Sequence, residues 1–313
     1  MNILIIGGTR FQGRYLVKEL LDAGNTVTVF HKGSHAVEPR SNLTDVIGDR
    51  NDPDDLAQLA SAQFDICIDT CAYFPKQVKL LGAVLKVQQY CLISSVYVYA
   101  DQDAVLNEDA KLIRSLDKQN QSMLTENYGA LKVLCEDEAL RQFGGDSLIL
   151  RPSIIIGMGD HTERLLFWMR LVALHGKRLD IYGREPMVQL VDVRDLARFT
   201  ARCLAKQKRG AVNVCGESVS LSELLDAIEV ISGRRCVRET INVGNLQGFC
   251  LERLPYCEAS HLARHDATLS HAWGFTSRDL WSTLKDIYED SHRQGFIMRR
   301  FQVEEAEILR LFS

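Results

Sequence analysis

The chain has 313 residues, of which 46% are hydrophobic and 25% are charged, and its 37 basic and 41 acidic side chains give a formal net charge of −4. These values are ordinary for a globular protein, and they exclude collagen-like, low-complexity and acidic-tail classes. The length suffices for a large core, in two domains or in one large domain with a smaller lobe. The small negative charge provides no general attraction to nucleic acid or anionic lipid.

The cysteines and the first residues bear on the cellular compartment. The nine cysteines are odd in number, form no Cys-x-x-Cys motif and include several within apolar runs, so we expect them to be reduced and mostly buried. The apolar segment Met1–Ile6 is too short for a secretion signal and lacks a basic flank. No stretch approaches the roughly 18 consecutive apolar residues of a membrane-spanning helix. We therefore expect a cytoplasmic protein that makes no membrane contact.

The first predicted elements form a strand–helix–strand unit. Ile3–Ile6 is a continuous apolar run, which is typical of a parallel strand covered on both faces. A glycine turn follows, and then a segment whose apolar residues have helical spacing. After a turn at Gly24-Asn25, Val27–Phe30 reads as the second strand.

The same alternation continues along the first half of the chain. We predict further strands near residues 45–48, 64–69, 89–94 and 147–150, and helices near 54–60, 76–87 and 125–143. Such alternation predicts an α/β protein with a Rossmann-type, doubly wound parallel sheet. Beyond Arg151 the pattern is less regular, with helices expected near residues 162–175, 194–205, 221–231 and 279–292.

The turn after the first strand has the form of a dinucleotide site. It reads Gly7-Gly8-Thr9-Arg10-Phe11-Gln12-Gly13, directly between the first strand and the first helix. Gly7 permits the tight turn, Gly13 permits close helix–strand packing, and the N–H groups that begin the helix point at a pyrophosphate. Arg10 replaces the middle glycine of the usual pattern and could bind a phosphate through its guanidinium. We predict that Gly7, Thr9, Arg10, Phe11 and Gly13 bind the cofactor.

The end of the second strand bears on which dinucleotide is bound. Sites for NAD usually place a carboxylate there to bind the ribose, but this chain has His31, 18 residues beyond Gly13, followed by Lys32. Two potential cations and no acid favour NADP(H) over NAD(H), although Lys32 could also be a solvated loop residue. Asp49, after the third strand, could bind the adenine amino group or begin a surface turn, and Arg50 beside it is a further cofactor candidate.

A second group of residues could transfer protons. Tyr128 and Lys132 lie four residues apart on a predicted helix, so both project from one face. A nearby ammonium would lower the phenol pKa from its usual value near 10 and make Tyr128 a usable proton carrier. Ser94-Ser95, at the end of a predicted strand, is a further candidate. Each feature alone is weak evidence for catalysis, since the Tyr–Lys spacing is common and the two serines could be only a turn. Together, at a strand end and on the next helix, they predict a catalytic group.

With these residues the chain resembles the extended and atypical short-chain dehydrogenase/reductases, specifically the NAD(P)-dependent epimerase/dehydratase group. The resemblance runs from Met1 to about Ile231 and is weaker beyond. The matching positions are Gly7, Gly8, Gly13, Asp49, residues 94–99, Tyr128 with Lys132, Arg151-Pro152, residues 191–197, and the later strand and helix at 213–224.

The resemblance implies a role for each matching residue. Ser95 would bind the reacting substrate oxygen, Tyr128 would transfer its proton, and Lys132 would hold the nicotinamide ribose and tune Tyr128. After the fourth strand, the cofactor would be lined by Thr70, Cys71 and Ala72. After a later strand, Pro152 and Ser153 would lie beside the nicotinamide amide. Arg10 and His31 depart from the pattern of NAD-dependent epimerases.

The two halves of the chain therefore have different expected tasks. We expect residues 1–155 to form the NAD(P)-binding domain, with segments near 188–215 returning to it, and residues 156–313 to form mainly a smaller C-terminal α/β substrate-binding lobe. Guanidinium groups there could bind an anionic or nucleotide-linked substrate. The substrate candidates are Ser95, Tyr97, His161, Arg164, Arg170 and Arg184.

Other features remain open in the sequence. His161 could line the cleft or only cap the next helix, and Phe167, Trp168 and Leu171 have the spacing of core residues. The polar segment 101–122 is either a surface excursion or a flap over the site. His261 and His265 lie four apart without the general-base glutamate of a metalloprotease site, so we expect no metal. Arg234-Arg235 and Arg299-Arg300 could bind phosphates, but a solvated face explains them better.

The sequence thus predicts an NAD(P)-dependent oxidoreductase or epimerase that acts on a secondary alcohol or ketone, for example of a sugar or nucleotide-sugar. His31 and Lys32 favour an NADPH-dependent carbonyl reductase of a biosynthetic pathway, whereas the resemblance favours an epimerase. A non-catalytic nucleotide-sensing or RNA-binding relative is the alternative of another class. The expected partner is a small-molecule substrate, with a homodimer left open and nucleic acid not expected.

Overall fold

The computed structural model describes residues 1–101, 105–115, 125–183, 185–242, 253–257 and 264–312. Its main feature is a seven-stranded parallel sheet with the order β11-β7-β5-β4-β1-β2-β3. The order reverses between β1 and β4, and in such sheets ligands bind at the carboxyl ends of the strands at this point. The strands are β1 (Asn2–Ile6), β2 (Thr26–His31), β3 (Leu43–Ile47), β4 (Ile66–Asp69), β5 (Gln89–Ile93), β7 (Leu148–Pro152) and β11 (Gly210–Val214).

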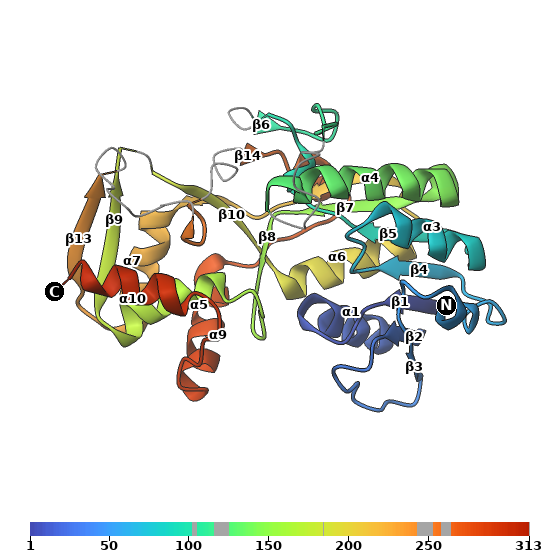
Figure 1. Cartoon of the computed structure of the whole chain (residues 1–313), viewed down its shortest axis with the longest axis horizontal. Coiled ribbons are helices and arrows are strands. Elements are labelled where there is room, and N and C mark those ends of the chain that lie inside the picture. Colours follow the sequence, from blue (N-terminus) through green and yellow to red (C-terminus); the bar gives the residue numbers. More distant parts are fainter. Residues whose placement is uncertain (102–104, 116–124, 184, 243–252, 258–263, 313) are drawn as a thin grey trace.

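Helices cover both faces of this sheet (Figure 1). Ile3 and Ile5 are buried against α1 (Phe11–Asp22) and α6 (Val193–Ala205). Leu4 and Ile6 point the other way, into a core shared with α2 (Pro53–Ala57), α3 (Pro75–Val84) and α4 (Thr125–Phe143). The predicted α/β class and doubly wound parallel sheet are therefore confirmed, and α4 begins and ends at the predicted residues.

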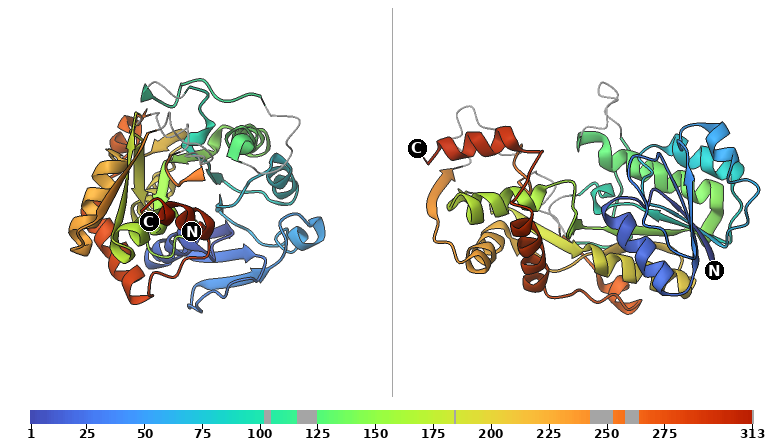
Figure 2. Two further views of the ribbon diagram at one scale, coloured as in Figure 1. Left: turned by 60° about the vertical axis from the view of Figure 1, so that its left-hand side comes forward. Right: turned by 90° about the horizontal axis from the view of Figure 1, so that it is seen from below.

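A second lobe lies at the opposite end of the molecule from the N-terminus, as Figures 1 and 2 show. Its sheets are β12-β10-β8 and β13-β9, and Phe167, Trp168 and Leu171 lie in its core, as their spacing predicts. The strands are β8 (Ile154–Ile156), β9 (Lys177–Tyr182), β10 (Met187–Asp192), β12 (Ser218–Ser220) and β13 (Val237–Asn242). The helices include α5 (Arg164–Met169), the π-helical turn η3 (Arg170–Leu174), α7 (Leu221–Ser232), α9 (Leu280–Arg293) and α10 (Gln302–Arg310).

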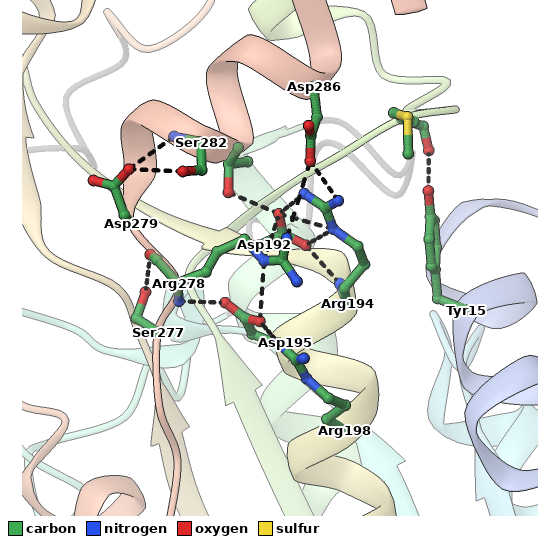
Figure 3. A network of polar contacts seen from close by, with 12 residues as sticks. Tyr15, Asp192, Arg194, Asp195, Arg198, Ser277, Arg278, Asp279, Ser282 and Asp286 are labelled. Atoms are coloured by element: carbon green, nitrogen blue, oxygen red, sulfur yellow. Dashed lines mark hydrogen bonds and ion pairs between the residues drawn. The ribbon is translucent and has the colours of Figure 1, made fainter. Parts of the chain in front are cut away.

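A network of ion pairs joins α6 to α9 (Figure 3). Asp192, at the end of β10, accepts hydrogen bonds from the Arg194 backbone and from Thr283 Oγ1, both at 2.8 Å. Arg194 binds Asp286 of α9 at 2.6 Å, and the Arg278 backbone donates to Asp195 at 2.7 Å. The start of α6 and the segment that carries α9 are thus held together by charged hydrogen bonds.

The described part of the polar segment 101–122 is held against β11 and against residues 98–100. β6 (Val105–Leu106) pairs with β14 (Arg264–His265), just before the short helix α8 (Thr268–Ala272), and Tyr99 forms a bridge with Leu112. The Asn213 side chain donates to the carbonyls of Leu106 and Asp266 at 3.2 and 3.1 Å. Residues 102–104 and 116–122 lie outside the described residues.

The eight cysteines that the structure describes are free, and six of them are buried. Within the described ranges, no helix has the length and apolar character needed to cross a membrane.

Candidate active site

The glycine turn between β1 and α1 has the geometry that a dinucleotide needs. Gly7 and Gly8 have φ angles of +97° and +85°, and a Cβ on Gly13 would lie 2.5 Å from the Gly8 Cα, so α1 rests directly on the turn. Arg10, the N-cap residue of α1, is exposed and makes no side-chain capping hydrogen bond. The first N–H groups of α1 are therefore available to a pyrophosphate, and the residues fit the expected cofactor.

The residues that follow β4 pack directly against this turn. Thr70 Oγ1 donates to the Ile6 carbonyl at 2.8 Å, and Gln12 donates to the Thr70 carbonyl at 3.2 Å. A Cβ on Gly7 would clash with Thr70 and press on Cys71. The structure thus brings Gly7, Thr70 and Cys71 together, which the sequence could place only at the ends of separate strands.

Ser95, Tyr128 and Lys132 meet at the carboxyl end of β5. Ser95, just beyond the strand, begins the 3-10 turn η1 (Val96–Val98), and its side chain lowers the pKa of the Tyr128 phenol on the first turn of α4. Lys132 is 3% exposed, and its ammonium donates to the carbonyls of Ala72 and Ile93 at 2.9 and 2.7 Å. An ammonium has three donors, so one remains to bind a ribose hydroxyl.

Burial dominates the ionisation of this group. It raises the pKa of Tyr128, and the hydrogen bond from Ser95 and the charge of Arg164 offset only part of that effect. Burial lowers the pKa of Lys132, whose ammonium points at backbone carbonyls. The prediction that the Tyr–Lys spacing lowers the phenol pKa is therefore wrong for the chain by itself, because desolvation outweighs the neighbouring charges.

Gly129 is a positioning residue that the sequence analysis missed. A Cβ there would lie less than 3.0 Å from the Tyr97 carbonyl oxygen, so glycine is what lets α4 touch η1. The Tyr97 ring lies edge-to-face with that of Tyr128, with 6.1 Å between centroids. A glycine inside a predicted helix was the available signal, since such a residue usually marks a close approach.

Pro152 and Ser153 reach the same edge of the sheet from β7. Pro152 is the last residue of the strand, and the Ser153 backbone donates to the Val214 carbonyl at 3.1 Å. Ser153 is 6% exposed, and its hydroxyl lies beside the Cys215 thiol, whose pKa burial raises to about 12. Both predicted cofactor residues thus lie next to β5, the strand that leads to Ser95.

The end of β2 differs from the prediction. His31 Nε2 lies 2.5 Å from Asp45 Oδ1, and Lys32 Nζ lies 3.1 Å from Asp49 Oδ2. Asp49 also accepts the Asn51 backbone N–H at 2.9 Å, which is the surface-turn geometry. The expectation of no carboxylate near His31 and Lys32 is therefore wrong. Strand β3 supplies Asp45, and the turn after β3 supplies Asp49.

Arg50 does not present its charge to the cofactor. Its guanidinium forms two hydrogen bonds to the Asp69 carboxylate, at 2.6 and 2.7 Å, and it is 7% exposed. Tyr90 donates to the same carboxylate at 2.9 Å. The prediction of Arg50 as a cofactor ligand is corrected, since Asp69 at the end of β4 holds it in the core.

Several basic residues gather beside the glycine turn. The His161 ring lies 6.3 Å from that of Phe11. Burial lowers the pKa of His161, and the charges of Arg10, Arg300 and Arg164 lower it further. The charge of Arg164 also acts on Tyr128. We call Arg10, His161, Arg164 and Arg300 the basic cluster.

The other two arginines proposed for the substrate have different outcomes. Arg170 binds both carboxylate oxygens of Glu305, at 2.7 and 2.9 Å, and also the Phe296 carbonyl. Its predicted substrate role is therefore wrong, because α10 supplies a carboxylate that holds it within the lobe. Arg184 lies outside the described residues.

Comparisons with known proteins agree with this geometry. A model of the NAD dependent epimerase/dehydratase family matches residues 3–79 and 74–215. The chain is 27% identical over 235 residues to "Chloroplast stem-loop binding protein of 41 kDa b" from Arabidopsis thaliana, covering 69% of this chain and 59% of that protein. It is 28% identical over 265 residues to a "Putative dihydroflavonol 4-reductase" from Synechocystis, covering 76% of this chain and 74% of that protein.

A solved structure shows the same fold. It is the UDP-glucuronic acid 4-epimerase from Bacillus cereus in complex with UDP-glucuronic acid and NAD, with a TM-score of 0.71 and 17% identity over 94% of this chain and 100% of that one. The family model spans more than half of the chain, and the matched residues include the glycine turn, Ser95 and Tyr128. The chain belongs to the NAD-dependent epimerase/dehydratase family, which confirms the resemblance seen in its sequence.

Proposed function

We propose that this chain is an NAD(P)-dependent oxidoreductase or epimerase that acts on a secondary alcohol or the corresponding ketone. The observation that carries the proposal is the meeting of Ser95, Tyr128 and the buried Lys132 ammonium at the carboxyl edge of the sheet. The bound dinucleotide would supply a nicotinamide that gives or accepts a hydride. Ser95 would hold the reacting oxygen, and Tyr128 would exchange a proton with it.

The raised pKa of Tyr128 fits a role as proton donor. A phenol whose pKa lies above its usual value of about 10 is protonated near neutral pH and is ready to donate. Reduction of a ketone needs one hydride at carbon and one proton at oxygen, and Tyr128 would provide the proton. Lys132, fixed by Ala72 and Ile93, would direct its third N–H bond at the ribose.

Replacement of Tyr128 tests this function. Tyr128→Phe removes the hydroxyl but keeps the ring that packs on Tyr97, so turnover should be lost while dinucleotide binding, followed by fluorescence, stays close to that of the wild type. Purified protein would be assayed with ketones, sugars and nucleotide-sugars. Turnover that persists in the phenylalanine variant contradicts the proposed role of Tyr128.

The basic cluster supports an anionic substrate, and we propose a nucleotide-linked sugar. The charge of Arg164 acts on both His161 and Tyr128, so this guanidinium lies near the proposed reaction centre. Guanidinium groups are well suited to phosphate oxygens. The structure from Bacillus cereus contains a substrate of this kind, UDP-glucuronic acid.

For the cofactor we propose a preference for NADP(H). Lys32 has a side chain that is 59% exposed, and Arg10 is exposed at the start of α1. His31 is paired with Asp45, so the attraction for a 2′-phosphate depends on Lys32 and Arg10 acting against the nearby Asp49. This balance of charges is open to direct measurement.

RNA binding without catalysis is the second candidate, and the match to a stem-loop binding protein favours it. Arg234 and Arg235 are exposed and could contact phosphates. In that case Arg234→Ala with Arg235→Ala would weaken RNA binding in a gel-shift assay, and Tyr128→Phe would change nothing. The grouping of Ser95, Tyr128 and Lys132 has no use in RNA binding, so it favours the enzyme.

A further inference from the structure

A buried polar network lies directly behind the candidate catalytic group, and the proposed chemistry leaves it without a task. Ser94 Oγ donates to Glu136 Oε1 at 2.5 Å, and Arg151 binds both Glu136 oxygens, at 3.1 and 2.8 Å. Arg151 also donates to the Tyr99 hydroxyl at 3.0 Å. Ser94, Tyr99, Glu136 and Arg151 are 4%, 1%, 3% and 4% exposed, and we call them the Glu136 network.

Three members of this network adjoin residues of the proposed site. Ser94 immediately precedes Ser95, and Arg151 immediately precedes Pro152. Glu136 follows Lys132 by four residues on α4, so Tyr128, Lys132 and Glu136 share one helix face. The network therefore ties together the ends of β5 and β7 and the helix that carries Tyr128.

Stability alone is a poor reason for such an arrangement. A buried ion pair loses much of its attraction to desolvation, and well-packed apolar side chains of similar volume often stabilise a core as well or better. Directional hydrogen bonds do something that apolar contacts do not, because they fix one element against another in a single register. Here the fixed elements are α4 and the end of β5.

We propose that Glu136 is a positioning residue, which acts through Ser94 and Arg151 to hold the Ser95 hydroxyl against the Tyr128 phenol. Its importance for catalysis rests on the proposed function, whereas the positioning itself rests only on the contacts above. Glu136 touches neither substrate nor cofactor in this scheme. The contact that it controls is the one between the Ser95 and Tyr128 side chains.

The ionisation of Tyr128 reports on that contact. The groups that act on this phenol are Ser95 at the end of β5, Arg164 on α5 and Cys135 on α4, and Tyr128 in turn acts on Tyr73 beyond β4. A hydrogen bond to a phenolate lowers its pKa, so displacement of Ser95 should raise it. Loss of folding stability by itself would leave the pKa of the folded protein unchanged.

The test is a ¹⁹F NMR titration of the full chain labelled with fluorotyrosine, whose phenol ionises at lower pH than that of tyrosine. Tyr128→Phe assigns the resonance. Ser95→Ala should raise the pKa at position 128 by about 1 to 2 units, the amount expected for a lost hydrogen bond to a charged group. Ser94→Ala and Glu136→Gln should each raise it by about 0.5 unit or more, and the double variant should add little to the larger single effect.

Glu305→Gln is the matched control, since it weakens a partly buried arginine pair in the other lobe and should leave the Tyr128 pKa unchanged. Ser94→Ala keeps the Glu136–Arg151 pair, so it remains informative if Glu136→Gln does not fold. The proposal is overturned if Ser94→Ala titrates like the wild type while Ser95→Ala shifts. The titration needs no substrate. Its result can therefore contradict the positioning role of Glu136 while Tyr128-dependent turnover is still observed. Equally, turnover can be absent while the titration supports that role.

Discussion

Gly129 on α4 rests against the carbonyl oxygen of Tyr97, so closely that a Cβ at position 129 would come within 3.0 Å of it. This contact sets how near α4 comes to η1, and therefore how near Tyr128 comes to Ser95. Glycine at position 129 thus allows the close approach that brings the Tyr128 phenol to the end of β5.

Gly129→Ala should lower kcat by about 10- to 100-fold, because the added methyl group forces α4 and η1 apart, and misplacement of a catalytic group by about 1 Å is that costly. Dinucleotide affinity should change little, since the glycine turn is untouched. Steady-state kinetics on folded protein would measure this. Gly145→Ala, where a Cβ meets no atom within 4 Å, is the control, and equal kinetics for the two variants would contradict the prediction.

Lys32→Ala should weaken NADP(H) binding by about 5-fold and leave NAD(H) binding unchanged, because an exposed ionic contact contributes about 1 kcal/mol. Asp49→Asn should have the opposite effect on NADP(H), since it removes the carboxylate that lies 3.1 Å from Lys32 Nζ. Arg10→Ala should weaken NADP(H) binding as well. Fluorescence titrations with both dinucleotides measure these affinities. The NADP(H) preference would be refuted if NAD(H) bound more tightly and none of the three substitutions changed the affinity for NADP(H).

Arg164→Ala should raise KM for an anionic substrate about 10-fold or more, as expected when a charged hydrogen bond of about 1.5 to 3 kcal/mol is lost. Arg170→Ala is the matched arginine control, because that guanidinium is bound to Glu305. It should lower the melting temperature and leave KM unchanged. The substrate proposal fails if the two variants raise KM equally.

Acid should remove the stability that Asp192 contributes. Burial would raise the pKa of Asp192, but hydrogen bonds from Arg194 and Thr283 hold it below its usual value. This contribution is present above the unfolded-state pKa of about 3.9 and is lost as the pH falls through the lower folded-state pKa. Asp192→Asn should therefore cost about 2 to 4 kcal/mol of unfolding free energy at pH 7, and less at about pH 3.

Urea unfolding at both pH values measures the effect of Asp192→Asn. Asp22→Asn is the surface control, since its carboxylate pairs with Lys18 and Arg40 in solvent, where ion pairs contribute little. A loss that is the same at neutral and acidic pH would show that ionisation of Asp192 is not its source.

Much of the fold and of the site is local, and local features were predictable. Apolar runs and helical spacing identified the strands and helices of the large sheet, and α4 has the predicted bounds of Thr125 and Phe143. The glycine turn was recognisable because its chemistry lies within seven consecutive residues, from Gly7 to Gly13. Placement of Ser95 at a strand end and Tyr128 on the following helix was enough to bring the two together.

What depended on distant partners was decided only by the tertiary structure. Arg50, His31 and Arg170 each looked available to a ligand, but their carboxylate partners lie 19, 14 and 135 residues away in the chain. The pKa of Tyr128 was mispredicted for a related reason, since the Lys132 ammonium was visible in the sequence whereas the burial of the phenol was not. Periodicity and turn chemistry are properties of neighbouring residues, whereas charge pairing and desolvation exist only once the chain has packed.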